Sequence, residues 1–127
     1  MTRRQENEFL KRMEAAKSNN IIVPEKMTLS SEIRGVYGFF AIKGDEEVLF
    51  YIGKSNNIFN RMFSGGHIYH YLRGVRKTDV QKRMAYYLEN GYKIEVRILK
   101  EVEYVGDSFI QDANRLALAE LEEIVNQ

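Results

Sequence analysis

The chain of 127 residues is long enough for one domain with a hydrophobic core and too short for two. Its composition, 44% apolar and 29% charged, is that of a soluble globular protein and excludes disordered and fibrous classes. The absence of cysteine excludes disulfide frameworks, thiol nucleophiles and iron–sulfur clusters, and fits a cytoplasmic location. No apolar run reaches the length of a membrane span, so no membrane association is expected.

The net charge of +1 conceals an uneven distribution. Residues 1–50 are balanced, residues 51–97 carry nine Lys or Arg against three Asp or Glu, and residues 98–127 carry two against seven. A basic middle segment favours a surface that faces a polyanion, and an acidic end favours a separate carboxylate-rich element. Two solvated faces of an ordinary domain would give the same pattern, so charge alone leaves both interpretations open.

The N-terminal part predicts a helix and a connector. Thr2 can cap a helix that runs to about Ser18, with a narrow apolar stripe that buries little surface. Asparagines and the single proline mark the stretch up to Ser31 as a connector. We therefore divide the chain into residues 1–32, the helix and connector, and residues 33–127, the main domain. The stripe consists of Phe9, Met13 and Ala16.

Two β-rich stretches, residues 33–42 and 48–53, flank turn-forming residues and predict a β-hairpin. Alternation places the even-numbered apolar residues of both strands on one face, which we expect to enter the core. Even positions must then pair with even ones, so Tyr37 and Tyr51 lie together on the opposite face. The even-numbered set is Val36, Phe40, Ile42, Val48, Phe50 and Ile52.

The second half predicts helices around one more strand. Ser55 can cap a short helix, and residues 67–77 are aromatic and basic without a predicted element. A helix from Thr78 to Asn90, a half-buried strand over residues 93–98 and a capping-box helix from Ser108 toward Val125 follow. This order indicates an α/β (α+β) fold, in which helices flank a small mixed or antiparallel three-stranded sheet.

One carboxylate interrupts the apolar side of the last predicted helix. On a period of about 3.6 residues, Glu120 falls inside the apolar arc, whereas Arg115, Glu122 and Glu123 fall outside it. A buried carboxylate is costly unless it is paired, bound to a metal or protonated. Glu120 is therefore either a salt-bridged residue at the edge of the arc or a functional carboxylate. The arc contains Phe109, Ile110, Ala113, Ala117, Leu121 and Ile124.

Several short motifs, taken in order, resemble the GIY-YIG endonuclease family. Gly35-Val36-Tyr37 and Tyr51-Ile52-Gly53 resemble its paired signature, and Arg61 resembles its helix arginine. His67 stands where many members carry a histidine, although His70 competes for that place. Glu120, four residues before Ile124, resembles the metal-binding glutamate. The resemblance covers about residues 33–125. It departs from the family at Val36, in a longer interval between the tyrosines, and in the unalignable stretch between Arg61 and Glu120.

The resemblance implies a GIY-YIG-like fold and a metal-dependent DNA endonuclease that hydrolyses phosphodiester bonds. Tyr37, beside Tyr51, would be the general base, which requires a nearby cation to lower its pKa from about 10. Arg61 would bind the scissile phosphate, and His67 would donate to the phosphate or orient the water. Glu120 would hold one Mg²⁺ (or Mn²⁺) ion that stabilises the leaving oxygen.

Basic residues between these motifs predict the surface that contacts DNA. They fit contacts to backbone phosphates, with Tyr69 and Tyr71 available for stacking. The same fold could instead be a non-catalytic nucleic-acid-binding or accessory module, and the first helix could dock a partner. A second copy of the chain or a protein partner could supply specificity. The predicted contacts are Lys54, Arg73, Arg76, Lys77, Lys82 and Arg83.

Overall fold

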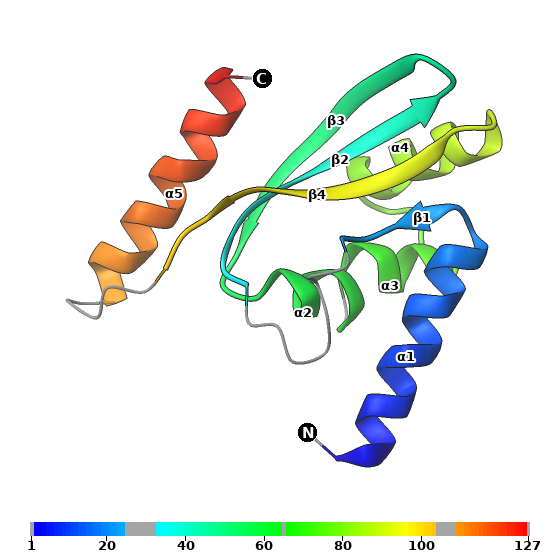
Figure 1. The fold of residues 1–127 in the computed structure, drawn as a ribbon, viewed down its shortest axis with the longest axis horizontal. Coiled ribbons are helices and arrows are strands. Elements are labelled where there is room, and N and C mark those ends of the chain that lie inside the picture. The colour runs from blue at the N-terminus through cyan, green and yellow to red at the C-terminus, as the bar shows by residue number, and fades with distance from the viewer. Residues whose placement is uncertain (1, 25–32, 65, 104–108, 127) are drawn as a thin grey trace.

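The computed structural model describes residues 2–24, 33–64, 66–103 and 109–126 (Figure 1). Its helices are α1 (Arg3–Ser18), α2 (Ile58–Phe63), α3 (His67–Leu72), α4 (Asp79–Glu89) and α5 (Phe109–Asn126). Its strands are β1 (Ile21–Ile22), β2 (Gly35–Lys43), β3 (Glu46–Ser55) and β4 (Lys93–Glu101). They form one mixed sheet in the order β1-β4-β2-β3, in which only the β1–β4 pair is parallel within the described residues.

The predicted α/β architecture, a sheet flanked by helices, is confirmed, but the predicted three strands are four. The additional strand, β1, lies in the stretch predicted as a connector, where Ile21 pairs with Ile94 of β4. Ile21 is 1% exposed. A strand of two residues is too short to show the alternation by which strands are recognised in a sequence, and one buried isoleucine is enough to fix it here.

The first helix packs on the same core through a few side chains. Thr2 caps α1 as predicted, and its side chain accepts from the Gln5 backbone N–H in a capping box. Phe9 meets Phe59 of α2 edge-on, with 5.5 Å between ring centroids. The narrow stripe buries little surface, as predicted, because Ala16 is the one fully buried residue of α1.

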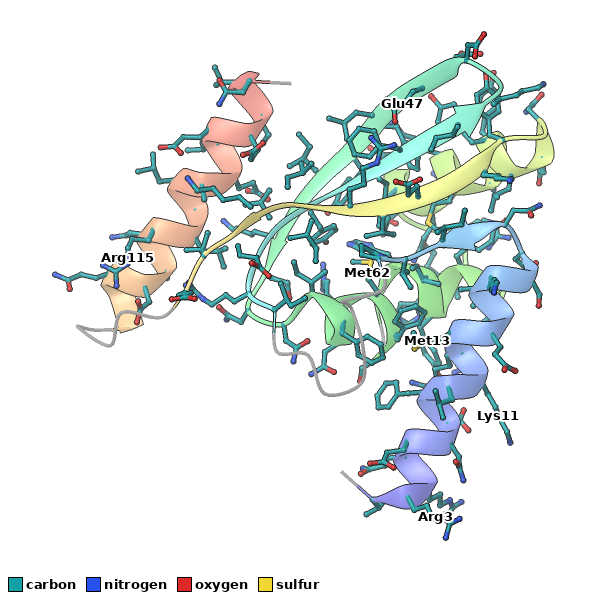
Figure 2. The ribbon with its side chains drawn as sticks, viewed as in Figure 1. Arg3, Lys11, Met13, Glu47, Met62 and Arg115 are labelled. Atoms are coloured by element: carbon teal, nitrogen blue, oxygen red, sulfur yellow. The ribbon has the colours of Figure 1, made fainter. Side chains whose placement is uncertain are left out.

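Most of the α1 surface is polar and solvated. Figure 2 shows Met13 pointing from α1 toward the body of the domain, whereas Arg3 and Lys11 extend away from it.

Over the described parts of the chain, no helix combines the length and the apolar character needed to cross a membrane.

The β2–β3 hairpin has the predicted pairing at the end that carries the tyrosines. Tyr37 lies opposite Gly53, and Phe39 lies opposite Tyr51, so odd positions pair with odd ones there. A bulge follows, because Phe40 pairs with Leu49 and leaves Phe50 as the extra residue of β3. Beyond the bulge the parity reverses, so the even-with-even pairing predicted for the whole hairpin holds only before it.

The main core lies on the odd-numbered face of β2, so the predicted core face is wrong. Tyr37, Phe39 and Ala41 have no exposed surface and pack in the cluster covered by α2, α3 and α4. Val36, on the even-numbered face, is equally buried, because α5 lies over that side of the sheet. A strand covered on both faces is apolar at nearly every position, and its alternation does not identify the larger core.

Two short helices follow the hairpin. Asn57, rather than the predicted Ser55, caps α2, since its Oδ1 accepts from the Asn60 N–H at 3.1 Å. The Ser55 hydroxyl instead accepts from the Asn57 N–H and so prepares the turn. Residues 67–72, without a predicted element, form α3. The helix predicted to open at Thr78 is α4, and Thr78 caps it in a capping box with Gln81.

The last helix presents a different face to the sheet than the predicted arc. Leu116 and Ala119 are buried, whereas Leu121 is 58% and Ile124 is 50% exposed. The buried arc of α5 is rotated about the helix axis by about 100° relative to the predicted arc, which is the angle between successive residues of an α-helix. The predicted packing face is therefore wrong. The predicted cap, Ser108, and the side chains of Phe109 and Ile110 lie outside the described residues.

A buried arginine accounts for this rotation. Arg34, 5% exposed, donates from its guanidinium to Asn56 Oδ1 at 3.0 Å, to the Val102 carbonyl at 2.8 Å and to the Asp112 carbonyl. Asp112 is also buried and pairs with Arg115 one turn later. The polar first turn of α5 therefore faces the sheet. Hydrogen bonds from Arg34 connect this turn to the end of β4 and to the turn before α2.

We expect Arg34→Met to lower the free energy of unfolding by about 3 kcal/mol, because several buried acceptors lose a charged donor. Urea unfolding followed by circular dichroism gives this value. Arg3→Met, on the exposed side of α1, is the matched control and should change it by less than about 0.5 kcal/mol. Equal unfolding midpoints for the two variants would contradict the role assigned to Arg34.

Candidate active site

Four of the predicted site residues lie together on the odd-numbered face of the sheet. They come from four elements: Tyr37 from β2, Tyr51 from β3, Arg61 from α2 and His67 from α3. Tyr37 Oη lies 2.9 Å from His67 Nε2, and the Tyr51 ring centroid lies 6.1 Å from that of Tyr37 and 5.1 Å from that of His67. Arg61 is close enough to influence the pKa of Tyr37 and of His67.

Two glycines allow this approach. A Cβ on Gly53 would lie 2.5 Å from Tyr37 Oη, so the phenol can fold over β3 only because position 53 has no side chain. A Cβ on Gly66 would lie 1.3 Å from the Arg61 carbonyl oxygen, which is backbone and cannot move aside. Gly66 thus lets α3 begin directly against α2, and the next residue, His67, faces Tyr37.

Burial sets the protonation of the cluster. Tyr37 has no exposed surface and His67 is 8% exposed, whereas Tyr51 is half-buried and Arg61 is exposed. Burial raises the pKa of Tyr37 well above its ordinary value, the Tyr51 phenol adds to this, and the Arg61 guanidinium opposes it. Burial lowers the pKa of His67, the charges of Arg61 and His70 add to this, and together they bring it to about 4. At neutral pH both groups are uncharged, and we assign the phenol as donor to Nε2.

The predicted metal ligand, Glu120, lies apart from these four residues. It belongs to α5, on the opposite side of the sheet from α2 and α3 (Figure 1). Its carboxylate, with the side chain 22% exposed, pairs with Lys54 Nζ at 3.7 Å. Lys54 lies three positions after Tyr51 with no bulge between them, so the two side chains project from opposite faces of β3. Of the two interpretations of Glu120 from the sequence, a salt-bridged residue or a functional carboxylate, the first matches its contact with Lys54.

The acidic end of the chain docks on the sheet through two ion pairs. Lys54 of β3 and Lys100 of β4 are the strand neighbours of Val36, one on each side. Lys54 pairs with Glu120, and Lys100 pairs with Glu122 at 3.2 Å. Two positive charges on the sheet are thus neutralised by α5, and the predicted phosphate contact at Lys54 already has a carboxylate partner.

A divalent metal ion does not fit the cluster of phenols. Among the residues described, no three His, Cys, Asp or Glu side chains gather as a metal-binding group. Mg²⁺ typically binds one or two carboxylates and retains several waters. Glu120 could supply one such ligand, but an ion held there would lie across the sheet from Tyr37 and Arg61.

One segment of the chain carries six positive charges without a carboxylate partner. Within the described residues, the six Lys and Arg side chains between positions 61 and 83 form no ion pair. Lys54, Arg97 and Lys100, outside that segment, each pair with a carboxylate. The unpaired set is carried by α2, α4 and the turn after α3, on one side of the sheet. It consists of Arg61, Arg73, Arg76, Lys77, Lys82 and Arg83.

Aromatic rings accompany these cations, because Tyr69 and Tyr71, which the sequence predicted to be available for stacking on nucleic acid, lie beside arginines. The Arg76 guanidinium lies 3.9 Å from the ring centroid of Tyr71, and that of Arg73 lies 5.3 Å from Tyr69. Arg83 has a second contact, because its Nη1 donates to the Phe50 carbonyl at 2.9 Å. Cations held flat against rings retain N–H donors for a ligand.

Sequence reasoning missed two residues that shape the site. Arg34 gave no signal, since a single arginine before a strand is usually exposed. Gly66 was read only as the end of a helix, and its contact with the Arg61 backbone depends on the unforeseen helix α3.

Compared with known protein families, with curated proteins and with solved structures, the chain matches none of them.

The neutral state of His67 gives stability a defined pH dependence. Its pKa is about 4 in the folded chain and about 6.5 when unfolded, so the unfolded chain binds this proton first as the pH falls. We expect the free energy of unfolding to fall by about 2 kcal/mol between pH 6.5 and 5 from this residue. Urea unfolding across that range measures it.

Two variants isolate the histidine. His67→Gln can still accept from Tyr37 but does not titrate, so it should flatten the pH dependence. His70→Gln, on the same helix, should keep most of it. Equal slopes for His67→Gln and the unaltered chain would mean that His67 is not the titrating group.

Proposed function

We propose that this chain is a DNA endonuclease of the GIY-YIG type, which hydrolyses phosphodiester bonds at the cluster of Tyr37, Tyr51, Arg61 and His67. The observation that supports the proposal is the convergence of these residues. The motif resemblance names them from separate parts of the chain, and they lie together on one face of the sheet. A GIY-YIG-like fold is part of the same proposal.

In this proposal, Arg61 binds the scissile phosphate. It is the exposed member of the cluster, it forms no ion pair within the described residues, and a guanidinium can bind two phosphate oxygens while it offsets the developing charge. Tyr51 is half-buried, whereas Tyr37 has no exposed surface. The substrate therefore meets Arg61 and Tyr51 before it meets Tyr37.

Tyr37 and His67 together accept the proton of the attacking water. Tyr37 alone is a poor base, because its phenol is protonated and its pKa is raised. As the water transfers a proton to Tyr37 Oη, the phenol proton passes to His67 Nε2, 2.9 Å away. A phosphate bound to Arg61 offsets one of the charges that lower the pKa of His67, so substrate binding makes the histidine a better acceptor.

The unpaired cations between positions 61 and 83 support DNA as the substrate. Contacts with backbone phosphates need positive charge that is not already neutralised, and this segment supplies it from three neighbouring elements on one side of the sheet. Lys54 is left out of this surface, since it pairs with Glu120.

The requirement for Mg²⁺ or Mn²⁺ is proposed on the motif resemblance alone. When bound, such an ion would stabilise the leaving oxygen. Glu120, the residue that the resemblance assigns to it, is held by Lys54 on the other face of the sheet and does not fit a site shared with Tyr37. The steps assigned to Arg61, Tyr37 and His67 do not depend on it.

A second candidate, a nucleic-acid-binding module without catalysis, is favoured by two specific observations. Tyr37 has no exposed surface, and Glu120 lies away from the phenols. The cationic surface would serve this function equally well. Cleavage, rather than binding, therefore separates the two candidates.

We expect the purified chain to nick supercoiled plasmid DNA, measured by gel electrophoresis with Mg²⁺, with Mn²⁺ and with EDTA. Arg61→Ala should slow nicking at least 100-fold, because the phosphate loses its charged donor. Tyr37→Phe should do the same, because the relay to His67 is broken. Arg3→Ala is the matched control and should cleave normally. Binding without nicking under all three conditions would support the non-catalytic module instead.

Glu120→Gln tests the metal. Loss of Mg²⁺-dependent nicking, with DNA affinity and unfolding midpoint unchanged, would support Glu120 as the ligand. Unchanged nicking by Glu120→Gln, or full activity of the unaltered chain in EDTA, would remove that assignment.

We expect DNA affinity to fall steeply with salt, because phosphate contacts release bound counterions. The double variant Arg76→Ala, Lys77→Ala should reduce the slope of log K against log [salt] by about 2. Lys100→Ala, which removes a paired cation from the other face, should leave it unchanged. Fluorescence anisotropy between 50 and 200 mM salt measures this, and about equal slopes for all three proteins would contradict the proposed surface.

A further inference from the structure

A second concave site lies beside the candidate active site. Between β3 and α4 the surface is hollowed by about 350 Å³, at the lower end of the range for small-ligand sites. Its lining combines aromatic rings with two basic side chains and one acidic side chain. The lining residues are Phe50, Asp79, Lys82, Arg83, Tyr86 and Tyr87.

The aromatic part of this hollow offers free ring surface. Tyr86 is 60% exposed, although it stands on a helix that buries Val80 and Met84. Its ring contacts Tyr87 edge-to-face at 5.2 Å, and Tyr87 in turn packs on Phe50 at 4.9 Å. Tyr87 is therefore held from behind by the core, while Tyr86 has surface left for a flat ligand.

The charges of the hollow fit an anion at one part of it. Lys82 is exposed and, within the described residues, has no ion-pair partner. Arg83 gives one N–H to the Phe50 carbonyl and keeps its other donors. Asp79 belongs to the first turn of α4, where a carboxylate stabilises the helix terminus. It would repel a second anion, so a single phosphate is favoured.

We propose that this hollow binds one nucleotide of single-stranded DNA, with its base stacked on Tyr86 and its phosphate bound by Lys82 and Arg83. Stacking of a base requires an unpaired base, because a duplex hides the ring faces, which are what Tyr86 can contact. The inference rests on the proposed function only in taking DNA as the substrate. It adds that the preferred DNA has an unpaired stretch.

The hollow and the candidate active site share one aromatic cluster. Phe50, which lines the hollow, is next to Tyr51 in β3 and packs on Phe39 at 6.0 Å. Phe39 in turn lies 5.8 Å from the Tyr37 ring. We therefore expect DNA that is partly single-stranded, such as a branch or an overhang, to be bound better than a plain duplex.

The test compares the binding of a labelled 12-nucleotide single strand with that of a duplex of the same composition. Anisotropy is measured in EDTA, so that no cleavage interferes. Tyr86→Ala should weaken single-strand binding about tenfold and duplex binding less than twofold. Tyr86→Phe keeps the ring and should bind normally. Leu118→Ala, an equally exposed residue of α5, is the matched control and should also bind normally.

Each outcome decides between the claims. Single-strand affinity that Tyr86→Ala leaves unchanged, or an equal loss for duplex, would overturn the stacking site. Tighter binding of RNA of the same sequence would overturn the assignment to DNA. A Tyr86 effect on binding without any plasmid cleavage would leave this inference standing and reject the endonuclease. Plasmid cleavage without any effect of Tyr86→Ala on binding would support the endonuclease and reject the stacking site.

Discussion

The hydrogen bond between Tyr37 and His67 is the constraint on which the arrangement of the site depends. A phenol without exposed surface needs a partner, and His67 supplies it at 2.9 Å. To do so, β2 must turn its odd-numbered face toward the helices, Gly53 must leave room for the ring, and α3 must begin directly after Gly66. The same burial keeps both groups uncharged at neutral pH. Packing and proton chemistry therefore follow from one contact.

The sheet separates charge by face. On one side, Glu120 and Glu122 of α5 neutralise Lys54 and Lys100, so this helix is attached by ion pairs as well as by a short apolar strip. On the other side, the cations between positions 61 and 83 have no carboxylate partner within the described residues. The acidic end and the basic middle of the sequence therefore differ in how their charges are paired in the structure. The acidic end forms ion pairs within the chain, and the six cations between positions 61 and 83 form none within the described residues.

The sequence predicted most elements because each carries a local signal. Thr2 and Thr78 cap their helices through their own side chains, and the two hairpin strands are β-rich stretches on either side of turn-forming residues. Convergence of the two tyrosines with His67 followed from pairing parity and motif resemblance. The failures depend on distant contacts: the face of α5 is turned by Arg34, which lies 78 positions from Asp112 in sequence. The strand β1 depends on pairing with the edge of β4, which lies far away in the sequence. The bulge at Phe50 is not indicated by any pattern in the sequence.

The bulge in β3 also affects how the sheet meets other molecules. β3 is an edge strand, and unpaired carbonyls on such an edge can recruit a strand from another chain. Here the extra residue interrupts the regular spacing of the edge, and Arg83 occupies the Phe50 carbonyl with a charged side chain. A guanidinium at that place opposes edge-to-edge polymerisation. The same arginine that lines the hollow therefore also makes the edge of the sheet less suited to pairing with a strand of another chain.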